Sequence, residues 1–134
     1  MVWIYLFEGH PQFGTTVQTL LRQIRAGGHT LLTSQFLLGE ILVRPVQKND
    51  LHTAAYYRRL LVETPAVEVV PFTTETAMQF ATIRALHRRT SPDSLHLALA
   101  ASGRADMFVT GDGHLTGLAV SGIGQIVDLS YRVP

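Results

Sequence analysis

The sequence predicts an α/β domain in which a parallel β-sheet is sandwiched between helices, a three-layer arrangement of the Rossmann-like kind. The main observation is that short apolar runs alternate along the chain with longer segments of helical periodicity. The second is that 134 residues suffice for one domain with its own core. No repeat, linker or low-complexity segment divides them. We therefore expect a single domain over residues 1–134.

Composition narrows the class of protein. Apolar residues make up 46% of the chain and charged residues 16%, which excludes a disordered chain. A net charge of +1 is no sign of nucleic-acid binding. The absence of cysteine excludes disulfides and zinc–thiolate sites and suits a reducing cytosol, so we expect a cytoplasmic protein. No apolar run approaches the roughly 18 residues of a membrane helix, so we expect no membrane partner.

The elements are predicted from their periodicity and length. Apolar positions at helical spacing predict helices at residues 15–28, 35–44, 49–63, 73–89 and 91–102. Short apolar runs predict strands at residues 29–33, 67–71, 106–112 and 125–130.

Start and stop signals support the first of these helices. Gly27–Gly28 ends the first one, because glycine readily adopts the backbone conformation that follows a helix. Thr33 or Ser34 is placed to cap the next helix, and Pro45 is expected to end it.

The later helices have similar signals. The threonine-plus-glutamate pattern of residues 73–75 is typical of a helix start. In the helix at residues 91–102, Ser91 is expected as the cap, Pro92 at the first helical position and Asp93 just inside. Gly103 is expected to end that helix.

Three acidic residues are predicted to meet at one edge of the sheet. Glu40 lies in the helix after the strand at residues 29–33, and Asp112 follows the strand that ends near Thr110. Asp93 opens the helix before that strand, and such a helix begins at the carboxyl edge. Ligands of parallel sheets bind outside this edge, so we expect the three carboxylates to lie together.

Each acid also has a simpler structural explanation. A carboxylate in a first helical turn, such as Asp93, is stabilised by the helix dipole by roughly 0.3–1 kcal/mol. Asp112 in the sequence TGDG is typical of a turn. Glu40 stands alone in an apolar helix and has Arg44 four residues on as a partner for an ion pair.

If the carboxylates do converge, their repulsion requires a cation. Hard oxygen ligands without cysteine favour Mg²⁺ or Mn²⁺. Such a site lowers the pKa of a bound water and stabilises charge on a phosphoryl group. That is the chemistry of phosphodiester hydrolysis.

Two stretches, TSQFLLGEILVRPV and VEVVPFTTETAMQFATIRALHRRTSPDSLHLALAASGRADMFVTGD, resemble the PIN-domain family, in particular the VapC-like toxin ribonucleases. The likeness covers nearly the whole chain and is most specific from Arg84 to Asp112. It implies a PIN-like fold with a parallel sheet between helices. It also implies metal-dependent cleavage of RNA, in the toxin role often restrained by a cognate antitoxin.

The resemblance also assigns roles to single residues. Glu40 matches the acid of the helix after the second strand, and Asp93 the acid that opens the helix before the fourth strand. Asp112 matches the acid just after that strand, and Thr110 the hydroxyl residue beside it. The catalytic set expected is therefore Glu40, Asp93, Asp112 and Thr110, with the three acids as ligands of Mg²⁺ or Mn²⁺.

The N-terminus departs from the family pattern, which has another acid at the end of a first strand. Taken alone, MVWIYLF predicts a strand. By resemblance it is the start of the first helix, and the strand with its aspartate is absent. Glu8 lies well past the matching position and is not assigned its role. Either the start codon lies upstream, or the chain has lost a ligand and its central strand.

Other polar residues near these acids have weaker claims to a function. His96 lies three residues after Asp93, and we expect it to pack or hydrogen-bond beside the site rather than bind the metal. Arg84, Arg88 and Arg89 suit the end of a helix, and they contact phosphates only if they face the site.

Three functions remain open from the sequence. The leading one is a toxin-type ribonuclease with RNA as substrate, an antitoxin as partner and a homodimer as a further association. The first alternative is a catalytically weak PIN-like module that binds RNA or a partner, because one acid is missing. The second is a phosphoryl-transfer or receiver-like α/β domain, although acids of such domains usually sit directly at strand ends.

Overall fold

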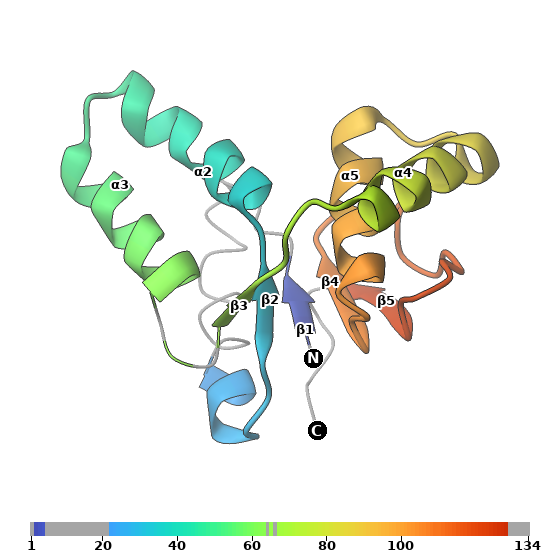
Figure 1. Ribbon diagram of the computed structural model, residues 1–134. Helices are drawn as coiled ribbons and strands as arrows, with labels where there is room; N and C mark the ends of the chain where they lie inside the picture. The colour runs from blue at the N-terminus through green and yellow to red at the C-terminus, as the bar shows by residue number, and fades with distance from the viewer. Residues whose placement is uncertain (1, 5–21, 64, 66, 129–134) are drawn as a thin grey trace.

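The structure is a computed structural model that describes residues 2–4, 22–63, 65 and 67–128 (Figure 1). The strands in this part of the chain form one parallel sheet with the order β3-β2-β1-β4-β5. They are β1 (Val2–Ile4), β2 (Leu31–Thr33), β3 (Val67–Val69), β4 (Met107–Thr110) and β5 (Gln125–Asp128). The α/β class with a parallel sheet is therefore confirmed.

The helices follow the predicted order. They are α2 (Gln35–Gln47), α3 (Leu51–Arg58), the π-helical turn η1 (Arg59–Glu63), α4 (Thr74–His87) and α5 (Ser91–Ser102). Residues 22–26 are also helical, which agrees with the first predicted helix, whereas residues 15–21 lie outside the described part. None of the helices described is long and apolar enough to cross a membrane.

The middle of the sheet corrects one expectation. β1 pairs with β2 on one side and with β4 on the other, so residues 2–4 form the central strand. The interpretation of MVWIYLF as the start of a helix, with the first strand missing, is therefore wrong for these residues. Valine, tryptophan and isoleucine suit a strand, and a strand here pairs backbone groups of both neighbours. Residues 5–7 lie outside the described part.

Three other expectations about helix ends need correction, the first of them at Pro45. Pro45 lies inside α2, which continues to Gln47. Proline removes one backbone donor, but Lys48 N–H still donates to the Arg44 carbonyl (3.0 Å) and Asp50 N–H to the Pro45 carbonyl (2.8 Å). The last turn of α2 is therefore held beyond the proline.

α4 and α5 both begin with a threonine cap. The Thr73 and Thr76 hydroxyls each accept from the other residue's N–H, at 3.4 and 3.0 Å, so a threonine and not the predicted glutamate closes the capping box. Thr90 caps α5 instead of Ser91, and its hydroxyl accepts from Asp93 N–H (3.4 Å). Asp93 remains in the first turn of α5.

The core surrounds α5 and β4. Every residue of β4 is buried, and so is nearly every residue of α5 from Ser94 to Ala101. A parallel sheet covered on both faces has such continuous apolar strands. Consequently α5 is a rigid support for the residues at its N-terminus.

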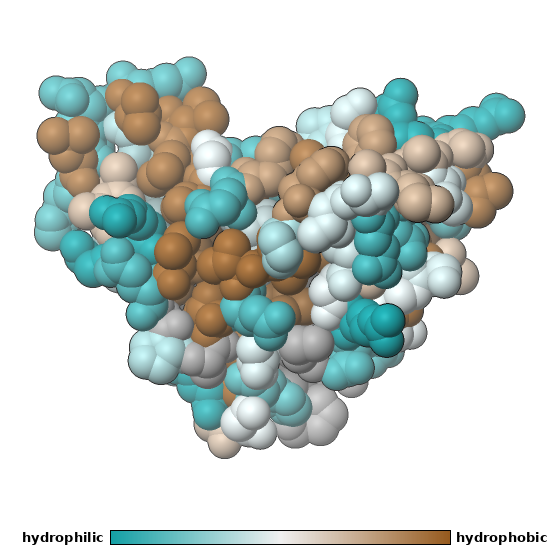
Figure 2. All heavy atoms as spheres, in the orientation of Figure 1, coloured by the Kyte–Doolittle hydropathy of each residue, from teal (hydrophilic) through white to brown (hydrophobic). Residues whose placement is uncertain are grey.

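At the carboxyl ends of the strands, α2 and α3 lie to one side and α4 and α5 to the other, and α5 also runs down beside β4 (Figure 1). We call α2, α3 and η1 the α2–α3 arm, and α4 with α5 the α4–α5 pair. The Thr33 hydroxyl at the end of β2 donates to the Leu61 carbonyl (2.8 Å) and so ties the arm to the sheet. Figure 2 shows that the surface is hollowed between the arm and the pair.

Two glycines give a matched test of this packing. A Cβ on Gly124 would lie 2.3 Å from the Asp106 carbonyl oxygen, beside the start of the β4–β5 ladder, whereas a Cβ on Gly39 would meet nothing within 4 Å. We expect Gly124→Ala to lower the free energy of unfolding by about 1–3 kcal/mol through overpacking. Gly39→Ala, in the exposed interior of α2, should raise it by roughly 0.5–1 kcal/mol.

Urea unfolding followed by circular dichroism measures both changes. Equal effects of the two substitutions would contradict the close approach of Gly124 to Asp106.

Candidate functional site

The site is built around a contact between α2 and α5. Glu40 lies in the second turn of α2 and its side chain is 34% exposed, whereas His96 on α5 is fully buried. The two side chains share a hydrogen bond between His96 Nε2 and Glu40 Oε1. This confirms that Glu40 is partly enclosed and that His96 hydrogen-bonds beside it. The observed partner of Glu40 is His96 and not Arg44.

The surroundings of His96 determine its charge state. Burial lowers its pKa below the ordinary value of 6.5, while the hydrogen bond to Glu40 and the charges of Glu40 and Asp93 act to raise it. Burial prevails, so the neutral ring donates its Nε2–H to the Glu40 carboxylate. The Phe36 ring packs against the imidazole with the centroids 4.9 Å apart.

Asp93 reaches the same histidine from within α5. It is half-buried in the first turn of the helix, where the dipole stabilises a negative charge. It precedes His96 by less than one turn, and its charge acts on the imidazole. The structure therefore joins Glu40 to His96, and Asp93 opens the helix that carries this histidine.

Thr110 and Asp112 form a separate local unit at the end of β4. Thr110 is fully buried, and its hydroxyl accepts from Asp112 N–H at 3.0 Å. Asp112 Oδ1 accepts from His114 N–H at 2.8 Å, so the aspartate caps its own turn. Thr110 thus lies beside Asp112 as expected, and the turn explanation of Asp112 is also confirmed.

The acids fit a divalent cation by their chemistry. Carboxylate oxygens are the ligands that Mg²⁺ prefers, and Glu40 has a second oxygen besides the one bonded to His96. Within the ranges that the structure describes, however, no three His, Cys, Asp or Glu side chains lie close enough together to hold a metal ion. A common ligand set of Glu40, Asp93 and Asp112 therefore stays a prediction.

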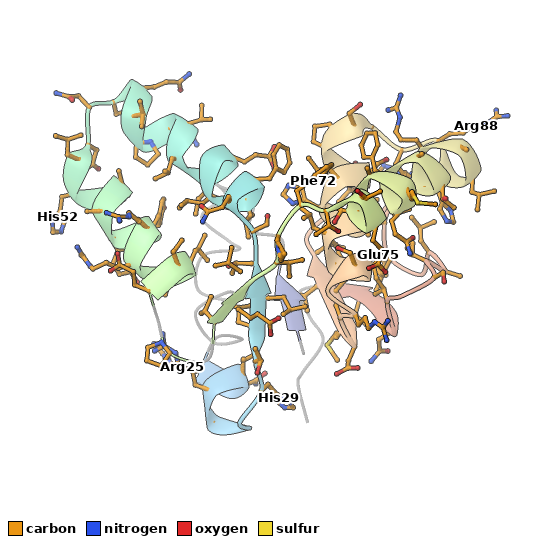
Figure 3. The ribbon with its side chains drawn as sticks, in the orientation of Figure 1. Arg25, His29, His52, Phe72, Glu75 and Arg88 are labelled. Atoms are coloured by element: carbon orange, nitrogen blue, oxygen red, sulfur yellow. The ribbon has the colours of Figure 1, made fainter. Side chains whose placement is uncertain are left out.

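The arginines at and after the end of α4 lie in or contact the loop that leads to Asp93. Arg84 Nη1 donates to the Arg89 carbonyl at 2.9 Å, and α4 ends at His87 rather than Arg89. Arg88 follows in a left-handed conformation, with φ of 52°. Figure 3 shows Arg88 at the outer tip of the α4–α5 pair, pointing away from the protein. Arg84 thus ties α4 to the loop that leads into α5.

Comparison with known proteins identifies a family but no individual relative. A family model described as the PIN domain matches residues 1–120, from β1 past the turn that follows β4. No curated protein and no solved structure matches the chain at a significant level.

Burial of His96 predicts a pH dependence of stability. The pKa of His96 in the folded protein lies below 6.5. The stability that its neutral ring contributes is therefore fully present above pH 6.5, and it is lost as the pH falls toward the folded pKa. Below 6.5 only the unfolded chain takes up this proton, at a slope of up to about 1.4 kcal/mol per pH unit. In metal-free buffer, His96→Leu should remove the part of the decline in the free energy of unfolding that His96 causes below pH 6.5.

The measurement is urea unfolding at several pH values between about 7.5 and 5.5. His52, which points outward from α3 in Figure 3, provides the control, and His52→Gln should leave the decline unchanged. A decline that is equally steep in His96→Leu and in wild type would rule out His96 as its source.

Proposed function

Since the chain belongs to the PIN-domain family, we propose that it is a Mg²⁺- or Mn²⁺-dependent endoribonuclease that acts as the toxin of a toxin–antitoxin pair. PIN domains are generally nucleases that bind RNA, and they typically use divalent metals. The toxin role is supported by the resemblance of residues 84–112 to VapC-like ribonucleases.

One structural observation carries the proposal further than the family alone. His96 on α5 bonds to Glu40 on α2, and Asp93 lies in the first turn of the same helix α5. Ligands of parallel sheets bind at the carboxyl edge, where the strand order reverses around β1. Two carboxylates in this position are the start of a site for phosphodiester cleavage.

The residues would share the chemistry as follows. A divalent cation, held by Glu40, Asp93 and Asp112, would lower the pKa of a water and stabilise charge on the phosphate. Thr110 holds the turn of Asp112 through the hydrogen bond to its N–H. The N-terminus of α5 stabilises the charge of Asp93. The hollow between the α2–α3 arm and the α4–α5 pair would admit the RNA strand (Figure 2).

A second function, that of a weak nuclease acting mainly by binding RNA or a partner, also has an observation in its favour. Within the residues that the structure describes, β1 carries no acid, because it consists of Val2, Trp3 and Ile4. Fewer ligands lower the affinity for the metal and the precision with which a water is held. Misplacement of a reacting group alone can lower the rate by about 10²-fold. A titration of Mn²⁺ with RNA cleavage as readout separates the two functions.

Substitution of the acids tests the site. We expect Glu40→Gln, Asp93→Asn and Asp112→Asn each to lower RNA cleavage by at least about 10²-fold, since each would remove a charged ligand. Mn²⁺ should raise the melting temperature of wild type because it binds the folded state, and Asp93→Asn should reduce that gain.

Glu68→Gln is the matched control, because Glu68 is an exposed acid on the edge strand β3. It should cleave RNA and respond to Mn²⁺ as wild type does. If Mn²⁺ stabilises wild type and Asp93→Asn equally, the metal binds elsewhere or not at all.

We further propose that the α2–α3 arm binds a protein partner, either an antitoxin or a second copy of the chain. Its apolar residues include Val43, Val46, Leu51 and Tyr56, which are between 50% and 71% exposed. Figure 2 shows hydrophobic residues on this arm. Apolar surface that gathers on one part of a small protein usually marks a contact with another molecule.

A charged substitution on the arm tests this association. Val46 is 63% exposed, so Val46→Lys should leave the fold intact while placing an ammonium group in the proposed contact. We expect sedimentation velocity to show wild type as a dimer, or as a complex with a co-expressed antitoxin, and the variant as a monomer. Wild type that stays monomeric at micromolar concentration, alone and with the antitoxin, would contradict the proposal.

A further inference from the structure

The hydrogen bond between His96 and Glu40 indicates a role for the histidine itself. We infer that His96 is a positioning residue, which holds the Glu40 carboxylate in the orientation that the site requires without contacting the substrate. This inference rests on the proposed nuclease function, since it concerns the same site.

The first argument is the contrast in freedom between the two side chains. His96 is fully buried on a helix that is buried nearly all round, and Phe36 packs against its ring. Glu40 is one third exposed, and a glutamate has several rotatable bonds. A fixed donor on one carboxylate oxygen therefore orients the other oxygen. Partners of this kind behind a ligand typically change metal affinity or activity by 10- to 100-fold.

The second argument is the chemical character of position 96. The buried residues that surround it in α5 are Leu97 and a run of leucine and alanine up to Ala101, and leucine would suit this environment better than an imidazole. Burying a polar ring of this kind has a free-energy cost unless it is hydrogen-bonded. The hydroxyl of Ser94, another buried polar residue of α5, donates to the Arg89 carbonyl in the loop just before its own helix. His96 instead reaches another helix.

The third argument is the position of the bond in the fold. It connects α2, which carries Glu40, to α5, which carries Asp93. His96 therefore influences the spacing between two acids of the site, although it is itself enclosed in the core. A substitution that keeps its volume and removes its donor should disturb the site more than the fold.

The experiment compares variants that differ in the donor. His96→Leu keeps an apolar side chain of similar size without a donor, and His96→Met does the same with a more adaptable shape. His96→Gln keeps an N–H donor. Thr76→Val is the control, because Thr76 is equally buried and hydrogen-bonded, to Thr73 and Ser102, but lies away from the acids.

Two readouts are needed: the Mn²⁺ concentration that gives half-maximal RNA cleavage, and the rise in melting temperature that Mn²⁺ produces without RNA. His96→Leu and His96→Met should require about 10- to 100-fold more Mn²⁺ and show a smaller rise. His96→Gln should need less Mn²⁺ than these two variants and should show a larger rise in melting temperature than they do. Thr76→Val should respond to Mn²⁺ as wild type does, even where its melting temperature is lower.

The outcomes separate the inference from the function on which it rests. If wild type cleaves RNA and the folded leucine or methionine variant needs no more Mn²⁺ than wild type, the positioning role is wrong and the nuclease function stands. The same conclusion follows if His96→Gln needs as much Mn²⁺ as His96→Leu. If wild type cleaves no RNA at any Mn²⁺ concentration, the proposed function fails and the inference fails with it.

Discussion

The hydrogen bond from the buried imidazole of His96 to the Glu40 carboxylate joins α2, which carries Glu40, to α5, which carries Asp93. One end lies on α5, which is enclosed by the core, and the other on α2, whose second turn reaches the surface. A neutral donor of this kind stabilises an ionised carboxylate in a partly enclosed position without adding a positive charge.

The parallel sheet explains why these residues meet where they do. β1 occupies the centre, with β2 paired to one side of it and β4 to the other. The helix that follows β2 and the helix that precedes β4 consequently have their N-terminal turns at the same edge. Asp93 lies in the first turn of α5 and Glu40 in the second turn of α2, while Thr110 ends β4 and Asp112 follows it.

Several features were predictable because they depend on local chemistry. Helical periodicity and buried strands indicated the alternation of elements, and Asp93 was correctly placed in a first turn. Local rules failed where neighbours decided: Pro45 is accommodated within α2, and Thr76 rather than a glutamate closes the cap of α4. At the N-terminus, residue type was the better guide than resemblance, because residues 2–4 pair with both β2 and β4.

The sequence by itself determined the α/β class, the acidic residues available for a site, and the likeness to the PIN domain that the family match over residues 1–120 confirms. Only the tertiary structure decided that Glu40 bonds to His96 and not to Arg44, which is closer in the sequence. Side-chain partners depend on which helices pack together, and 56 residues separate Glu40 from His96. Helical spacing describes neighbours on one helix, whereas the contact between α2 and α5 arises from the order of the strands that carry them.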